Sequence, residues 1–361
     1  MKKLPVKCVY HFWDSFRLFS SHSLCKTSPL FIACCINRVH KHIRSSVSKG
    51  DAMTTNVLFF SDMGVDDAVA LMYASFTKTI NIVGIVCSYG NVPVEDAVRN
   101  AHFLLDSLGL NDVPVIKGAE RPMKGESPTY TTKVHGTHGL GSIVPPFASE
   151  GQNFGIVKSI LERYGGELII VDTGRLTSLA MAIMLYGELL KKVKGYYIMG
   201  GAFLVPGNVT PVAEANFAGD PVAADLVMRR GGPIALFPLN VTHKAIVTQN
   251  MSDSINRVGK VPLFKPIFDV YYDFYKTSMP QLQGAPTHDL LPMMALVNRH
   301  MFQWMNRPVH VVAQEGIAMG QSIADFRPNA TAQPNAIRLA LDLDYSQFYW
   351  SFMTTMTDKK G

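Results

Sequence analysis

Residues 56–76, NVLFFSDMGVDDAVALMYASF, contain the clearest indication of a fold class in this chain. The start of this stretch, Val57–Phe60, is a short apolar run with a valine and two phenylalanines, which predicts a buried strand. A helix is predicted from Asp66 to Phe76, and Gly64 in the turn between them permits a tight bend. A buried strand that runs directly into a helix is the first unit of an α/β fold.

The alternation of strand-like and helical patterns continues along the chain. A second helix is predicted over 94–108, and further apolar runs predict strands at 82–86, 113–116, 168–171, 196–199 and 234–237. This order predicts a single α/β domain with an open, mostly parallel sheet and helices on both faces. Ligands are then expected at the carboxyl ends of the strands. The aromatic-, Met- and Pro-rich stretch 240–289 is interpreted as helices that cover a site.

Composition and charge argue against two classes of partner. Of the 361 residues, 47% are hydrophobic, but no run approaches the ~20 apolar residues of a membrane-spanning helix. The net charge is +6, yet residues 1–52 alone hold nine Lys/Arg and two acids. The remaining residues hold 25 Lys/Arg and 26 Asp/Glu, so the main body is nearly neutral. Neither a membrane nor a nucleic acid is therefore expected as a partner.

Residues 1–52 form a basic, Ser-rich, acid-poor extension ahead of the predicted domain, residues 53–361. Such a composition is typical of an organelle transit peptide. The alternative, an upstream segment before a working start at Met53, stays open. Only Cys87 of the five cysteines lies in the body, which favours a reducing compartment. A cytoplasmic location is expected, with an organellar one if the extension is a transit peptide.

Three carboxylates follow the first predicted strand within six residues: Asp62, Asp66 and Asp67. Like charges at close range raise each other's pKa or recruit a cation. A hard cation such as Ca²⁺ suits an all-oxygen set of ligands. The alternative is an acidic helix N-terminus, since Asp there favours the helix dipole. That alternative explains Asp66 or Asp67, but it does not explain Asp62.

The same segment resembles the aspartate signature D-x-D-P-G-x-D-D of the inosine–uridine-preferring nucleoside hydrolase family. Phe60 stands at the first Asp of the signature and Met63 at its Pro. Other segments resemble motifs of this family in the same order: GN at 90–91, VHGTHGLG at 134–141, DTGRLT at 172–177, MGG at 199–201, PVAEAN at 211–216, THD at 287–289 and ADFR at 324–327. His138 and Ala215 depart from the residues usual in the family at those places.

The resemblance implies a Rossmann-like nucleoside hydrolase fold. It also implies calcium-dependent cleavage of the N-glycosidic bond of ribonucleosides to free base and ribose. Asp62 is implied as the base that activates the attacking water, and His288 as the group beside the departing base. The calcium ligands implied are Asp62, Asp67, Asp289 and the carbonyl of Thr173. Substrate contacts are implied for Asp66, Asn91, His135, Met199, Asn208, Glu214, Asn216 and Asp289.

Three alternatives stay open: an inactive nucleoside- or ribose-binding homologue, a purine-specific ribohydrolase, and a phosphatase-like hydrolase. A binder does not need the acids of a metal site, and Phe60 replaces the nucleophilic carboxylate that such phosphatases often use. By resemblance, His288 favours a uridine- or inosine-type substrate. Stacking on Tyr271, Tyr272 or Tyr275 would favour purines. The resemblance also implies a homodimer or homotetramer.

Overall fold

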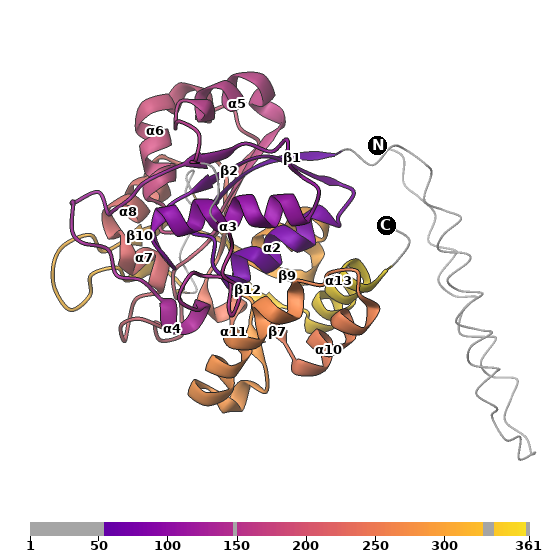
Figure 1. The fold of residues 1–361 in the computed structure, drawn as a ribbon. Helices are drawn as coiled ribbons and strands as arrows, with labels where there is room; N and C mark the ends of the chain where they lie inside the picture. Colours follow the sequence, from indigo (N-terminus) through magenta and orange to yellow (C-terminus); the bar gives the residue numbers. More distant parts are fainter. Residues whose placement is uncertain (1–53, 147–149, 328–335, 359–361) are drawn as a thin grey trace, which may run out of the picture. The chain divides into compact units, whose positions relative to one another are not determined.

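An eight-stranded sheet forms the centre of the fold in the computed structural model, which describes residues 54–146, 150–327 and 336–358 (Figure 1). The extension predicted at 1–52 lies outside the described residues. The strand order is β3-β2-β1-β4-β5-β6-β12-β9. Every neighbouring pair is parallel except β12 and β9. The strands are β1 (Thr55–Ser61), β2 (Ile80–Cys87), β3 (Val115–Lys117), β4 (Leu168–Asp172), β5 (Gly195–Met199), β6 (Ile234–Phe237), β9 (Phe302–Arg307) and β12 (Ile337–Leu343).

Both faces of the sheet are covered by helices, which explains the unbroken apolar run of β1. Val57 and Phe59 lie in one hydrophobic core, while Leu58 and Phe60 lie in the other. The first core is closed by α2 (Val65–Ser75), α3 (Val94–Ser107), α10 (Gln249–Val258), α11 (Phe264–Ser278), α12 (Leu290–Val297) and α13 (Tyr345–Thr357). The second is closed by α5 (Ile156–Tyr164), α6 (Thr177–Leu190) and α8 (Pro221–Arg230). The predicted fold class is confirmed.

The predicted elements are found with small shifts, and several short strands are additional. The strand predicted at 113–116 begins only at Val115, because Pro114 before it has no N–H to give to the ladder. Strands β9 and β12 were not predicted. Two small antiparallel pairs are also additional: β7 (Ile246–Val247) with β8 (Ala285–Pro286), and β10 (Val309–Val311) with β11 (Ser322–Ala324). No helix in the described ranges is long and apolar enough to cross a membrane.

The loops that matter for chemistry follow four neighbouring parallel strands: β2, β1, β4 and β5. Ser61 pairs with Cys87 at the ends of β1 and β2, and Phe60 pairs with Asp172 at the end of β4. The segments after these strands therefore meet at one edge of the sheet. The remaining short elements are α4 (Thr132–His135), α7 (Ala215–Gly219), α9 (Leu239–Thr242), η3 (Gly165–Glu167), η4 (Pro280–Leu282) and η5 (Arg299–Met301).

Candidate active site

A cavity of about 340 Å³ lies where these segments meet. That volume is within the usual range for a small-molecule site. Helix α11 lines the cavity with Tyr271 and Tyr275, as the interpretation of stretch 240–289 requires. The structure brings ten of the predicted site residues to the cavity wall: Asp66, Asn91, His135, Thr173, Met199, Asn208, Glu214, Asn216, His288 and Asp289. Asp62 and Asp67 do not line it, but both accept hydrogen bonds from the lining residue Asn91.

The turn between β1 and α2 aims the acids into this region. Met63 has φ of 32°, in the left-handed range that a proline ring cannot reach. The turn here therefore differs from one built around the proline of the family signature. A Cβ on Gly64 would lie 2.5 Å from both the Asn91 amide nitrogen and His135 Nδ1, so only glycine fits without displacing them. The Gly64 N–H donates to Asp67 Oδ2 (2.8 Å) and begins α2.

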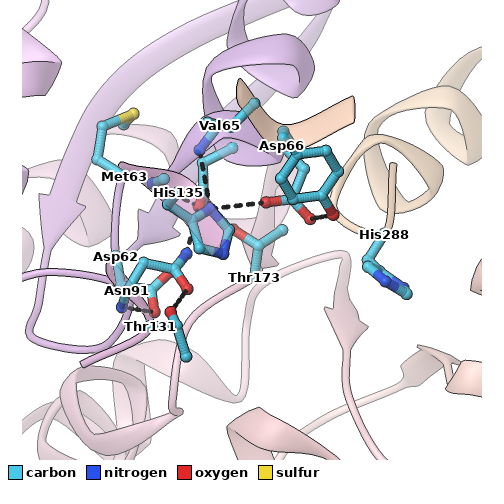
Figure 2. Close-up of polar contacts among 12 residues, drawn as sticks. Asp62, Met63, Val65, Asp66, Asn91, Thr131, His135, Thr173 and His288 are labelled. Atoms are coloured by element: carbon cyan, nitrogen blue, oxygen red, sulfur yellow. Dashed lines mark hydrogen bonds and ion pairs between the residues drawn. The ribbon is translucent and has the colours of Figure 1, made fainter. Parts of the chain in front are cut away.

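Asp62 is held by a single neighbour through both of its oxygens. The backbone N–H of Asn91 donates to Oδ2 (2.8 Å), and the Asn91 side-chain amide donates to Oδ1 (3.0 Å). The amide is oriented in turn by Thr131, whose hydroxyl donates to Asn91 Oδ1 (2.7 Å) (Figure 2). A Cβ on Gly90 would fall 1.8 Å from Asp62 Oδ2, so glycine is required beside this carboxylate. Asp62 is thus fixed, with lone pairs left on both oxygens.

Asp67 accepts four hydrogen bonds and lies at the base of the acid cluster. The hydroxyls of Thr173 (2.6 Å) and Ser61 (2.7 Å) donate to Oδ1. The N–H of Gly64 (2.8 Å) and the amide of Asn91 (3.2 Å) donate to Oδ2. These donors come from β1, its turn, and the loops after β2 and β4. The carboxylate therefore joins the segments that follow three of the four strands β2, β1, β4 and β5.

Asp66 and Asp289 complete the cluster at the cavity wall. Asp66 Oδ2 accepts from the Tyr271 hydroxyl at 3.4 Å, and Oδ1 lies 3.7 Å from His135 Nδ1 (Figure 2). Oδ1 is buried and has no hydrogen-bond partner within the described ranges. Carboxylate oxygens of Asp66, Asp67 and Asp289 lie within 4.8 Å of one another. Such a buried set, with an oxygen left unsatisfied, has the donor chemistry of a site for a hard cation.

The electrostatics agree with that interpretation. Burial raises the pKa of Asp62 and of Asp289 well above the ordinary range, and neighbouring aspartates add to the rise. Burial, followed by the charge of Asp67, raises the pKa of Asp66 to about 7. These acids are therefore costly to ionise together unless a cation lies between them. Among the described residues, the group that could hold a metal ion is Asp66, Asp67 and Asp289, with Asp62 beside it.

The segment from Met199 to Asn216 forms a further part of the cavity wall. Glu214 caps α7: its carboxylate accepts from the N–H groups of Asn216 (2.8 Å), Gly201 (2.9 Å) and Phe217 (3.2 Å). The Asn216 amide donates to the carbonyl of Thr173 (2.8 Å), the carbonyl predicted as a calcium ligand. Burial raises the pKa of Glu214. Both side chains line the cavity, and their backbone contacts hold them in place there.

Two histidines, His135 and His288, also line the cavity. The Val65 N–H donates to His135 Nδ1 (3.1 Å), and burial lowers the pKa of this imidazole to about 3. His288 contacts the Thr242 hydroxyl through Nδ1 (2.8 Å) and the Tyr275 hydroxyl through Nε2 (3.2 Å). Burial and the neighbouring His243 lower the pKa of His288 well below its ordinary value. Both rings are thus neutral and can each offer one N–H.

The sequence interpretation missed three residues that orient the site: Thr131, Thr242 and Arg175. Thr131 and Thr242 hold Asn91 and His288 through single hydroxyls, and lone threonines carry no sequence signal. Arg175 belongs to the DTGRLT segment, but its type and spacing suggested no partner. In the structure, Arg175 donates to the backbone carbonyls of Gly90 and Thr129.

Comparisons with known proteins agree with this arrangement. The family model described as inosine-uridine preferring nucleoside hydrolase matches residues 57–350. Uridine nucleosidase 1 of Arabidopsis thaliana is 34% identical over 293 residues, which are 79% of this chain and 87% of that protein. The pyrimidine-specific ribonucleoside hydrolase RihA of Shewanella sp. (strain MR-7) is 30% identical over 305 residues, 82% of this chain and 94% of that protein.

Solved structures lead to the same result. The purine-preferring ribonucleoside hydrolase from Gardnerella vaginalis superposes with a TM-score of 0.78 at 29% identity, covering 84% of this chain and 98% of that one. The plant nucleoside hydrolase PpNRh1 also gives a TM-score of 0.78, at 27% identity, over 84% of this chain and 99% of that one. The match over most of the domain confirms the predicted resemblance, and this chain belongs to the inosine-uridine preferring nucleoside hydrolase family, whose members hydrolyse N-glycosyl bonds.

Proposed function

We propose that this protein hydrolyses the N-glycosidic bond of ribonucleosides to free base and ribose, with Ca²⁺ as its cofactor and Asp62 as the base for water. One observation carries the proposal: buried carboxylates and two neutral histidines line one and the same cavity. The acids suit a sugar that becomes positively charged, and the histidines suit a departing base.

Attack by water is the step assigned to Asp62. A bound cation would lower the pKa of a water beside this carboxylate, which then accepts the proton. Asn91 donates to both oxygens of Asp62 and so holds the carboxylate in one orientation. Asp62, Asp67, Asp289 and the carbonyl of Thr173 are the proposed ligands, the set that the sequence predicts. The grouping of Asp66 with Asp67 and Asp289 makes Asp66 a further candidate ligand.

The ribose hydroxyls are assigned to the polar groups that line the cavity next to the acids. Asp66, Asn91, Asn208, Glu214, Asn216 and Asp289 are the candidates, with Met199 packed against the sugar. Negative charge close to the ribose stabilises the oxocarbenium character of the transition state. Because the acids are almost fully buried, little water competes with these contacts.

Departure of the base is assigned to the two histidines of the cavity wall. The low pKa of His288 and of His135 supports a role as neutral hydrogen-bond donors rather than as stored protons. The Tyr275 hydroxyl lies 3.2 Å from His288 Nε2 and extends this polar group toward the base. Such a wall accepts a pyrimidine carbonyl or a purine ring nitrogen. We propose a uridine- or inosine-type preference.

Base preference and reaction type are tested together. The purified protein is incubated with uridine, cytidine, inosine, adenosine, guanosine and uridine 5′-monophosphate, and free base, free ribose and phosphate are measured separately. We expect equal amounts of base and ribose from uridine or inosine, and no phosphate. Phosphate release without base release would favour the phosphatase-like alternative. Nucleoside binding without any product would favour the binding-protein alternative.

Location and assembly complete the proposal. We propose a cytoplasmic homodimer or homotetramer, or an organellar one if residues 1–52 are a transit peptide. Light scattering after gel filtration measures the mass of the assembly. Imaging of a tagged full-length chain beside one that starts at Met53 separates a targeting segment from an inert one, because only a targeting segment changes the location.

A further inference from the structure

Arg175 has a place in the fold that the proposed mechanism does not explain. Arg175 lies in the loop after β4, two positions after Thr173, and only 5% of its surface is exposed. Among the described residues, it is the only Lys or Arg that is buried. A guanidinium is costly to bury and stays inside a fold only where acceptors or charges compensate for the lost water. Its partners therefore indicate what it does.

The guanidinium joins two loops that are far apart in the sequence. Nη2 donates to the carbonyl of Gly90 (3.1 Å), in the loop after β2, and to the carbonyl of Thr129 (2.8 Å), in the loop before α4. The guanidinium carbon also lies 5.4 Å from the ring centroid of Tyr89, within the range of a cation–π contact. One side chain thus holds both loops at their backbone.

The same two loops orient the proposed catalytic base. The Thr131 N–H donates to the Asn91 carbonyl (3.0 Å), and its hydroxyl donates to the Asn91 amide oxygen (2.7 Å). Asn91 in turn supplies the hydrogen bonds that both oxygens of Asp62 accept. The carbonyls that Arg175 contacts therefore belong to the residue directly before Asn91 on one loop and to the residue two positions before Thr131 on the other.

A third segment, the end of α7, packs against the side chain of Arg175. A Cβ on Gly219, at the end of α7, would lie 2.3 Å from Arg175 Cδ and 2.7 Å from Nε. The arginine stem therefore packs directly on the backbone of the short helix that carries Asn216. The positive charge also acts at a distance: burial raises the pKa of Asp62 and of Glu214, and the charge of Arg175 opposes that rise.

We infer that Arg175 is a positioning residue for the hydrolysis: it clamps the loops of Asn91 and Thr131 against α7 and thereby fixes the carboxylate of Asp62. This inference rests on the proposed role of Asp62 as the base. Loss of the Arg175 contacts should lower mainly kcat, because these contacts position the base for the attacking water and do not bind the nucleoside. A displacement of about 1 Å at such a group can cost ~10²-fold in rate.

Three variants separate the parts of the clamp. Arg175→Met keeps the stem and removes the donors. Arg175→Lys keeps the charge, but its point-like ammonium cannot reproduce the planar fork. Gly219→Ala keeps the guanidinium and pushes its stem away. Arg163→Met is the matched control, because the exposed Arg163 lies 5.3 Å above the ring of Tyr164, away from the site.

With uridine as substrate, we expect Arg175→Met and Gly219→Ala to lower kcat by about 10- to 100-fold, with KM within about threefold of wild type. Arg175→Lys should recover part of the loss, and Arg163→Met should match wild type. Hydrogen exchange supplies the second readout. The amides of Asn91 and Thr131 should exchange faster in Arg175→Met, while those of β1 and β4 stay protected.

Wild-type kcat in Arg175→Met would overturn the inference, whatever the exchange data show. A loss of kcat with faster exchange across the whole sheet would also overturn it, since Arg175 would then serve stability alone. A wild-type protein that cleaves none of the five ribonucleosides refutes the proposed function instead. In that case the exchange of the two loops still decides whether Arg175 clamps them.

Discussion

Replacing Asp62 with Asn removes one negative charge and leaves the side chain almost unchanged in size. In the structure, both Asp62 oxygens accept hydrogen bonds from Asn91. After the substitution, one of these positions becomes an NH₂ group that faces a donor. Asn91 cannot turn its amide to compensate without losing the 2.7 Å contact from Thr131 and the 3.2 Å contact to Asp67.

The structural cost of this change is modest. One hydrogen bond to a charged group is lost, which contributes about 1.5–3 kcal/mol. Part of this is offset because Asp67 and Asp66 repel an ionised Asp62. Domains of this kind are stable by about 5–15 kcal/mol, so the variant should stay folded. Loss of an essential general base, in contrast, lowers kcat by about 10²–10⁴-fold. The activity should therefore fall much further than the stability.

The assay pairs uridine hydrolysis with thermal unfolding. Asp220→Asn is the control: this buried carboxylate accepts from Thr177 (2.7 Å), Met123 (2.8 Å) and Ala223 (3.0 Å), but it does not line the cavity. We expect Asp220→Asn to lower the unfolding temperature and to keep kcat near wild type. The assignment of Asp62 as the base is refuted if Asp62→Asn retains more than about a tenth of wild-type kcat. The activation free energy would then have risen by less than ~1.4 kcal/mol.

Three further predictions follow from the same site. A 2′-deoxynucleoside leaves buried polar groups of the cavity wall unpaired, so its kcat/KM should fall by as much as ~10⁴-fold below that of the ribonucleoside; equal values would sink the assignment of ribose contacts. Exhaustive treatment with chelator should abolish turnover and added Ca²⁺ should restore it; full activity in protein that elemental analysis finds free of divalent metal would contradict the proposed cofactor. A chain that starts at Met53 should keep wild-type kcat, since every site residue lies after Val57, and a folded but inactive product would show that the domain starts earlier.

Buried parallel strands could be predicted closely because their side chains are apolar on both faces. β4 and β6 begin at their predicted residues, and β5 begins one residue early. The antiparallel edge strand β9, with the sequence FQWMNR, could not be recognised in this way, because polar residues interrupt its pattern. Its conformation depends on pairing with β12, which is about 35 residues further along the chain.

The chemical types in the site and their order along the chain could be predicted before the fold was known. The local features are the acids after β1, an asparagine after β2 and a His-Asp pair before α12. The position of each one relative to its strand or helix can be read from the sequence. Which of these residues contact one another depends on the three-dimensional fold. It groups Asp66 with Asp67 and Asp289, and it turns both oxygens of Asp62 toward Asn91.

The clamp of Arg175 and the hydroxyls of Thr131 and Thr242 likewise emerged only from the fold. The physical reason is that strand and helix patterns come from interactions between residues a few positions apart, whereas these contacts join loops 40 or more positions apart. Such contacts depend on loop paths and side-chain rotamers, which burial and hydrogen bonding select together only when the sheet has brought the loops to one edge.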